Sequence, residues 1–301
     1  MLTEAEKKKL VTALRGTSVA KEHITPEYSR NLELADRQEI RVETSEGPVT
    51  CYVFTAKNRT ACCRVHVNIH GGGFVRPHEK RDEIYSAKVA DGIQGIVVDV
   101  DYSLAPEYPY PTAFHQCYDV CRWVFSMLEQ WDGDKNRVSV GGHSAGANLT
   151  AAVCLKAGQT GEFKPCLQVL DYGGFDMATD PADKPEADTN MIPVERGRMF
   201  SQAYTDGNTE LLKNPYCSPL MADNDMLGRT PEALVICAGK DNFRFEDMEY
   251  ASRLALAGVK VTAKCFLHSY HGFIVHCTEE WEAGQALVIR MICQAALNVE
   301  D

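Results

Sequence analysis

The residue types that could perform covalent chemistry centre on Ser144. It lies in the pentapeptide Gly142-His143-Ser144-Ala145-Gly146, after a short β-branched run and before a helix-compatible segment. A serine held in a sharp turn from strand to helix leaves little room for neighbouring side chains, so glycine is needed two residues before it and two residues after it. Such a turn exposes the hydroxyl and points the N-terminus of the next helix toward the group that it attacks. The pattern therefore predicts that Ser144 is a nucleophile.

A serine nucleophile needs a base, and the base needs a carboxylate that orients it. Asp241 and His271 follow Ser144 in that order, and each comes just after a predicted strand. Serine, acid and histidine in this order is one of the arrangements in which the chemistry occurs. We favour His271 over His268 as the base because a glycine follows it in a turn. We favour Asp241 over Asp176, the alternative acid that also follows a strand.

A run of glycines after His70 marks a second chemical feature. Three successive glycines stand at the end of a predicted strand, where their entropic cost is justified if backbone N–H groups must approach a ligand closely. His66 and His70 lie four residues apart along one strand and would chelate a metal poorly. We therefore expect the His70 imidazole to stabilise this loop by hydrogen bonding.

The remaining titratable residues near these motifs are expected to have structural roles. His143 should point away from the pocket because of its position in the turn. Glu246 and Asp247 should belong to the first turn of a helix, where acidic residues are favourable. Five further histidines are expected at the surface or in packing, namely His23, His66, His78, His115 and His276.

Composition excludes several classes of protein. The 301 residues are 45% hydrophobic, enough for one large core, and the net charge of −11 argues against a nucleic-acid or anionic membrane surface. No apolar run approaches the roughly 20 residues of a membrane-spanning helix, and the N-terminus lacks the apolar core of a signal peptide. We expect a soluble, cytoplasmic protein. Its twelve cysteines should be buried free thiols, since their spacing suits zinc poorly. We expect neither a metal nor a cofactor.

Strand-like and helical segments alternate along most of the chain, which predicts an α/β fold with a mostly parallel sheet covered by helices on both faces. Ligands of such sheets bind beyond the carboxyl ends of the strands, where all the candidate residues fall. The predicted strands are a hairpin (40–42 and 49–54), then 64–69, 95–101, 138–140, 167–172, 233–237 and 259–266. The predicted helices are 3–15, 26–34, 79–90, 114–128, 145–157, 194–204, 246–257 and 279–297.

Six motifs together resemble the hormone-sensitive lipase family of α/β-hydrolases, in its bacterial carboxylesterase and acetyl esterase branch. They are His70-Gly-Gly-Gly-Phe74, Asp101-Tyr-Ser-Leu-Ala-Pro-Glu107, Gly142-His-Ser-Ala-Gly146, Asn214-Pro-Tyr-Cys-Ser-Pro-Leu220, Ala238-Gly-Lys-Asp241 and His271-Gly-Phe273. The resemblance runs from about residue 40 to the C-terminus. The chain departs from the family pattern at Ser103, His143, Ala147, Asn242 and Phe243, where the family usually carries Arg, Asp, Gly, Pro and Leu.

The resemblance implies an α/β-hydrolase fold with Ser144 as nucleophile, His271 as base and Asp241 as its orienting acid. It also implies an oxyanion hole made by backbone N–H groups, contributed by Gly72, Gly73 and Ala145. The expected organisation is a single domain, 1–301, with a helical cap formed by about 1–38 and about 178–212. The segments outside the strand–helix alternation fall in these same two ranges.

The expected function is hydrolysis of short-chain acyl esters of small molecules by a serine carboxylesterase, through an acyl-enzyme intermediate. An amide or formamide hydrolase with the same triad is the alternative. A third reading is a non-catalytic ligand-binding protein on this fold, as in the plant hormone receptors that resemble this family but lack the catalytic histidine. The chain keeps that histidine at His271, which disfavours the third reading. The sequence does not fix the oligomeric state, and we allow for a homodimer.

Overall fold

The computed structural model describes residues 1–16, 22–187 and 192–297. Its centre is an eight-stranded sheet with the order β1-β2-β4-β3-β5-β6-β7-β8. β1 and β2 form the predicted antiparallel hairpin, β2 also runs antiparallel to β4, and all other neighbours are parallel. The mostly parallel sheet is therefore confirmed. The strands are β1 (Ala35–Val42), β2 (Val49–Ala56), β3 (Cys63–Ile69), β4 (Ile96–Asp101), β5 (Gly133–His143), β6 (Leu167–Asp171), β7 (Glu232–Ala238) and β8 (Val261–Phe266).

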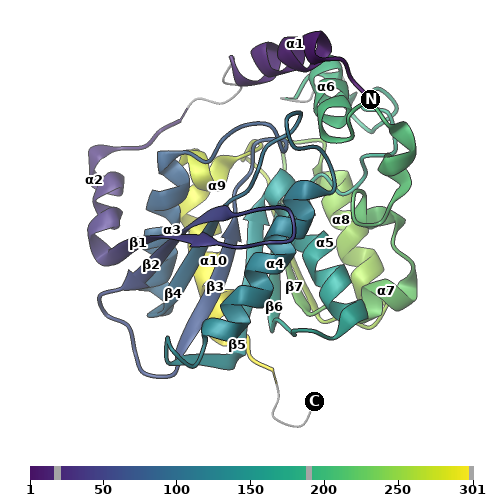
Figure 1. Cartoon of the computed structure of the whole chain (residues 1–301). Helices are drawn as coiled ribbons and strands as arrows, with labels where there is room; N and C mark the ends of the chain where they lie inside the picture. The colour runs from purple at the N-terminus through teal and green to yellow at the C-terminus, as the bar shows by residue number, and fades with distance from the viewer. Residues whose placement is uncertain (17–21, 188–191, 298–301) are drawn as a thin grey trace.

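Helices cover both faces of this sheet (Figure 1). Successive residues of a strand point to opposite faces, so Val169 packs in a buried cluster with α3 and α10, while its neighbour Leu170 packs with α5, α7 and α8. The helices of the first face are α3 (Lys80–Ile93), α9 (Phe273–His276) and α10 (Trp281–Gln294). Those of the second are α4 (Thr112–Met127), α5 (Ala145–Thr160), α7 (Asn224–Gly228) and α8 (Arg244–Leu256).

The N-terminal segment contains the predicted first helix, α1 (Glu4–Arg15). Thr3 and Glu6 close a capping box at its start, as their spacing indicates. The predicted helix over 26–34 is instead a short helix, α2 (Pro26–Ser29), followed by the 3-10 helix η1 (Arg30–Leu34). A segment this short is marginal as a free helix, so its geometry follows from its packing, which for η1 is against α3.

The segment between β6 and β7 carries the predicted helix α6 (Val194–Tyr204) and two 3-10 helices, η3 (Thr209–Lys213) and η4 (Pro219–Met221). Helices α1 and α6 pack together at the top of the view in Figure 1, beyond the sheet. The expected cap ranges include 17–21 and 188–191, which lie outside the described residues. β1 begins at Ala35, so the end of the first range already belongs to the sheet.

A buried ion pair that the sequence did not predict lies near the start of α3. His78 Nε2 is 2.8 Å from Asp99 Oδ2 on β4, and both side chains are almost fully buried. Asn68 on β3 donates a hydrogen bond of 2.8 Å to the other oxygen of Asp99. We expected His78 at the surface or in packing, without a charged partner; the partner comes from a strand 21 residues away along the chain.

This pair predicts a specific loss of stability at alkaline pH. Although burial alone would lower it, the Asp99 carboxylate raises the pKa of His78 from 6.5 to about 9. The contribution to stability is full below the unfolded pKa and is lost as the pH rises through the folded pKa. We expect the free energy of unfolding to fall by about 3 kcal/mol more in the wild type than in Asp99→Asn between pH 6.5 and pH 9.

Urea unfolding of both proteins under reducing conditions measures this difference. The thiols that ionise in the unfolded chain are the same in both proteins, so their contribution cancels. Equal pH slopes for the wild type and Asp99→Asn would show that the pair does not stabilise the fold in its charged form.

Candidate active site

Ser144 occupies a strained turn between β5 and α5. Its backbone angles are φ 54° and ψ −115°, a region that residues with side chains rarely adopt. The surroundings explain the glycine spacing. A Cβ on Gly142 would lie 2.5 Å from the carbonyl oxygen of Gly146, and a Cβ on Gly146 would overlap the carbonyl oxygen of Ile69. The turn therefore requires glycine on both sides of the serine.

The structure brings Ser144, His271 and Asp241 into one hydrogen-bonded chain. His271 Nε2 lies 2.8 Å from Ser144 Oγ, and His271 Nδ1 lies 2.5 Å from Asp241 Oδ2. The two alternatives do not join this chain of hydrogen bonds. His268 is exposed, and its backbone N–H donates to Glu280. The Asp176 carboxylate accepts hydrogen bonds from its own loop.

Aromatic rings hold the His271 imidazole on two sides. The ring of Tyr172 meets it edge to face at a centroid distance of 5.2 Å, and the ring of Phe243 does so at 5.4 Å. Gly272 follows with φ +83°, so the residue after the histidine adopts the left-handed conformation that glycine permits. The turn that distinguished His271 from His268 in the sequence is therefore present.

The glycine loop after β3 lies against Ser144. Gly72, Gly73 and Ala145 line the same cavity as the serine. The backbone N–H groups of Gly72 and Gly73 donate to no acceptor among the described residues. The imidazole Nδ1 of His70 lies 2.7 Å from the Gly71 carbonyl oxygen, so the predicted stabilisation of this loop by His70 is confirmed.

Substitution of Gly73 by alanine tests the loop. Gly73 has φ +62°, and an added Cβ would overlap the Phe200 ring of α6. The family resemblance implies that the Gly73 N–H is an oxyanion donor, and alanine keeps this N–H but must shift the loop away from Phe200. We therefore expect Gly73→Ala to lower kcat for ester hydrolysis by up to about 10²–10³-fold, the usual cost of one lost oxyanion donor. The control is Gly47→Ala, at a glycine with φ +92° and open space around it in the hairpin. Equal kcat values for the two folded variants would show that the glycine loop does not contribute to catalysis.

The cavity around Ser144 has a volume of about 170 Å³ and is lined from several segments. α6 contributes Phe200 and Ser201, and the loop after β6 contributes Met177. His143 also contributes to its wall. The His143 side chain is buried, with its ring close to those of Tyr85 and Tyr172, and its orientation away from the pocket stays a prediction. Its Nδ1 lies 3.0 Å from Asp171 Oδ2 at the end of the adjacent strand β6, and both side chains are buried.

Two arginines and a histidine lie in the wall formed by the segment before α3, by the first turn of α3 and by α9. These residues are Arg76, Arg81 and His276. Burial, together with the positive charge of Arg81 and of nearby groups, lowers the pKa of His276 to about 3. His276 is therefore neutral at physiological pH. It also lines the cavity, whereas the sequence predicted a surface or packing position for it.

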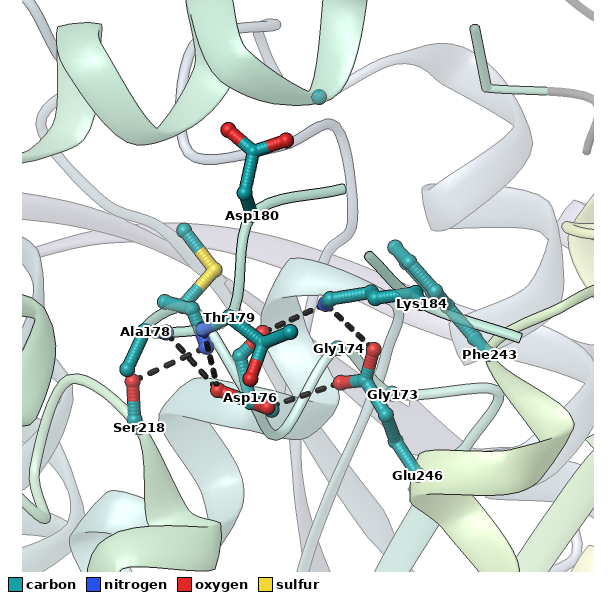
Figure 2. A network of polar contacts seen from close by, with 12 residues as sticks. Gly173, Gly174, Asp176, Ala178, Thr179, Asp180, Lys184, Ser218, Phe243 and Glu246 are labelled. Carbon is teal, nitrogen blue, oxygen red and sulfur yellow. Dashed lines mark hydrogen bonds and ion pairs between the residues drawn. The ribbon is translucent and has the colours of Figure 1, made fainter. Parts of the chain in front are cut away.

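A second group of residues at the cavity was not predicted from the sequence. Lys184, in the segment between β6 and α6, forms an ion pair of 2.5 Å with Glu246 of α8, and both side chains are nearly buried. Glu246 also accepts the backbone N–H of Asp176 at 2.7 Å. Figure 2 shows these residues converging beside Phe243. Glu246 does lie in the first turn of α8, as expected, but nothing in the sequence pointed to Lys184.

Comparison with known proteins identifies the family. Residues 66–275 match the model of a family described as having the alpha/beta hydrolase fold. The chain belongs to this α/β-hydrolase family. Its resemblance to the hormone-sensitive lipase group is thus confirmed, as is the predicted fold class.

Individual α/β-hydrolases similar to the chain carry esterase or deacetylase names. Esterase LipI of Mycobacterium tuberculosis is 34% identical over 210 residues, which are 68% of this chain and 64% of that protein. The arylacetamide deacetylase of Oryctolagus cuniculus is 27% identical over 286 residues, covering 75% of this chain and 72% of the relative. The crystal structure of EstE1, a thermostable carboxylesterase from a metagenomic library, superposes with a TM-score of 0.81 at 27% identity, over 98% of this chain and 96% of that one.

One further property of the described helices bears on membrane association. Across residues 1–16, 22–187 and 192–297, each helix is too short or too polar to cross a bilayer.

Proposed function

We propose that this α/β-hydrolase is a serine carboxylesterase that hydrolyses short-chain acyl esters of small molecules. The observation that carries the proposal is the hydrogen-bonded chain from Asp241 through His271 to Ser144, with distances of 2.5 Å and 2.8 Å, at the wall of a cavity. Several relatives bear the name esterase or carboxylesterase, which supports the same reaction.

In the proposed mechanism, His271 Nε2 takes the proton of Ser144 as its oxygen attacks the ester carbonyl carbon. The carbonyl oxygen becomes an oxyanion that the N–H groups of Gly72, Gly73 and Ala145 stabilise. Asp241 keeps the imidazole oriented and stabilises its protonated form. His271 then protonates the leaving alcohol as the tetrahedral intermediate collapses to the acyl-enzyme.

Deacylation repeats these steps with water as the nucleophile. His271 takes a proton from the water, whose oxygen attacks the acyl carbon, and then returns a proton to Ser144 as the carboxylic acid leaves. One ester and one water yield one acid and one alcohol. The protein supplies positioning and hydrogen-bond donors, and the reaction as written uses neither a metal nor a cofactor.

We further propose that α1 and the described residues 178–187 and 192–212 cover the cavity as a cap on a single domain. Phe200 and Ser201 of α6 line the cavity, and α1 packs against α6. Leu10 and Leu14 are the buried residues of α1. This arrangement supports a cap whose side chains limit the length of the bound acyl group.

Hydrolysis of p-nitrophenyl esters from acetate to decanoate tests the proposed function. We expect turnover with the highest kcat/KM among the short-chain esters, because the cavity has a volume of only about 170 Å³ and large side chains such as Phe200 and Met177 line it. Inertness toward every ester would refute the proposal.

Amide hydrolysis with the same residues is the second candidate, favoured by the arylacetamide deacetylase among the relatives. Acetanilide, assayed beside p-nitrophenyl acetate, distinguishes the two. A kcat/KM for the anilide that equals or exceeds that for the ester would favour the amide reading.

The location and the assembly of the protein are also proposals. All twelve cysteines are free thiols, most of them buried, and such thiols suit a reducing compartment. The cytoplasm is therefore the location that we propose. The homodimer allowed for by the sequence stays a prediction.

A further inference from the structure

Lys184 and Asp176 line the same cavity as Ser144. Figure 2 shows the Lys184 chain extending past the Phe243 ring toward Asp176 and Glu246. The Lys184 ammonium lies 5.5 Å from the centre of that ring. The cavity wall next to Phe243 is therefore polar, although an ester with a plain alkyl alcohol would offer it no hydrogen bond.

These two side chains retain hydrogen-bonding capacity after their protein contacts are counted. The Lys184 ammonium donates to the Asp176 carbonyl oxygen at 2.6 Å and to Glu246 at 2.5 Å, which leaves one of its three N–H groups. Asp176 Oδ1 accepts the N–H groups of Ala178 and Thr179 at 2.9 and 3.0 Å. Asp176 Oδ2 accepts no hydrogen bond from the described residues. One donor and one acceptor thus remain.

The charge of this group selects the kind of ligand. Glu246 neutralises Lys184, and Asp176 adds a negative charge, so a carboxylate or phosphate placed between Lys184 and Asp176 would be repelled by the Asp176 carboxylate. A hydroxyl group can donate to the Asp176 carboxylate and accept from the Lys184 ammonium. Neutral ligands with adjacent hydroxyls satisfy both positions.

The position of Phe243 indicates which part of the ester reaches this group. The leaving oxygen must lie near His271 Nε2, because it receives its proton from that atom. The ring of Phe243 contacts His271 edge to face at 5.4 Å and also lies beside Lys184. The alcohol part of the ester, on the His271 side of Ser144, is therefore the part that approaches Lys184 and Asp176.

We propose that Lys184 and Asp176 form a subsite for hydroxyl groups on the leaving alcohol. The substrates are then acyl esters of polyhydroxylated alcohols, such as glycerol or a sugar, rather than esters of alkyl alcohols. This inference rests on the proposed esterase function and names its substrate class. Lys184 and Asp176 determine specificity, whereas Glu246 holds Lys184 in place.

Glycerol monoacetate and propyl acetate make a matched pair of probes. They share the acyl group and a three-carbon alcohol and differ in two hydroxyls, so their acyl-enzymes are identical. We expect the wild type to prefer glycerol monoacetate in kcat/KM by about 10- to 100-fold, the usual effect of hydrogen bonds to charged groups.

Four variants locate the preference. Lys184→Met alone would leave Glu246 buried without its counter-charge, so the double variant Lys184→Met/Glu246→Gln is compared with Glu246→Gln. We expect the double variant to lose at least about tenfold of the preference that Glu246→Gln retains. Asp176→Asn keeps an acceptor for its own loop and should also reduce the preference. Lys260→Met, at an exposed lysine paired with Glu232, should keep the wild-type ratio.

A wild-type ratio near one would overturn the subsite, as would equal ratios in the double variant and Glu246→Gln. Turnover of propyl acetate and p-nitrophenyl acetate in the same samples shows whether the esterase function itself holds. If both are hydrolysed without a preference, only the subsite fails. If no ester is hydrolysed, the proposed function fails and the subsite fails with it.

Discussion

Replacement of Ser144 by alanine is expected to lower kcat for p-nitrophenyl acetate by about 10⁶-fold, the loss seen when a triad nucleophile is removed. The reason is that no other oxygen in the described chain lies 2.8 Å from His271 Nε2 within the cavity. Alanine is smaller than serine and tolerates the same backbone as poorly as serine does, so the fold should be retained. The measurement is the initial rate of p-nitrophenol release.

Ser126→Ala is the matched control, since Ser126 is an exposed serine near the end of α4 whose hydroxyl donates to the Trp123 carbonyl oxygen. It should hydrolyse the ester like the wild type. Residual turnover in Ser144→Ala should remain above the uncatalysed rate, because the oxyanion donors and binding persist. A Ser144→Ala variant with wild-type kcat would show that Ser144 is not the nucleophile.

Asp241→Asn is the second substitution with a large expected effect, a loss of about 10⁴-fold in kcat. Asp241 is fully buried, and its Oδ2 faces His271 Nδ1 at 2.5 Å. An amide at this position can donate to Nδ1 and so favours the imidazole tautomer that cannot accept the Ser144 proton. Burial of a neutral amide costs less than burial of a carboxylate, so the folded variant should be recoverable for assay.

Asp176→Asn distinguishes the two acids that the sequence left open. Asp241→Asn should lose at least about 100-fold more kcat than Asp176→Asn, because only Asp241 contacts the imidazole. Circular dichroism and a thermal midpoint on both variants establish that folded protein is compared. The reverse ranking of the two losses would assign the orienting role to Asp176.

The residues predicted for chemistry share local constraints that a sequence displays. Gly142 and Gly146 are required by the steric environment of one turn, and Gly272 by a positive φ beside His271. The parallel sheet follows from the alternation of strands and helices, and it places the ends of β5, β7 and β8 at one edge. Such features depend on a few neighbouring residues, so their spacing alone indicates them.

The residues that the sequence did not reveal depend on partners far along the chain. Lys184 meets Glu246 across 62 residues, and His143 meets Asp171 on the next strand. The sequence predicts a loop around His78 and a buried strand around Asp99, and neither segment indicates that the two side chains form an ion pair. No periodicity connects the members of these pairs. Only the packed fold shows that each charge has a partner and which of them line the cavity.

The central claim is that Ser144 forms the acyl-enzyme, and mass spectrometry of a trapped intermediate tests it most directly. The wild type is reacted with a p-nitrophenyl ester, quenched in acid during the first turnover and digested. We predict one acyl adduct per chain on the peptide that contains Ser144, and none on that peptide in Ser144→Ala. An adduct on one of the twelve cysteines, or steady ester turnover with no acylated Ser144, would contradict the account.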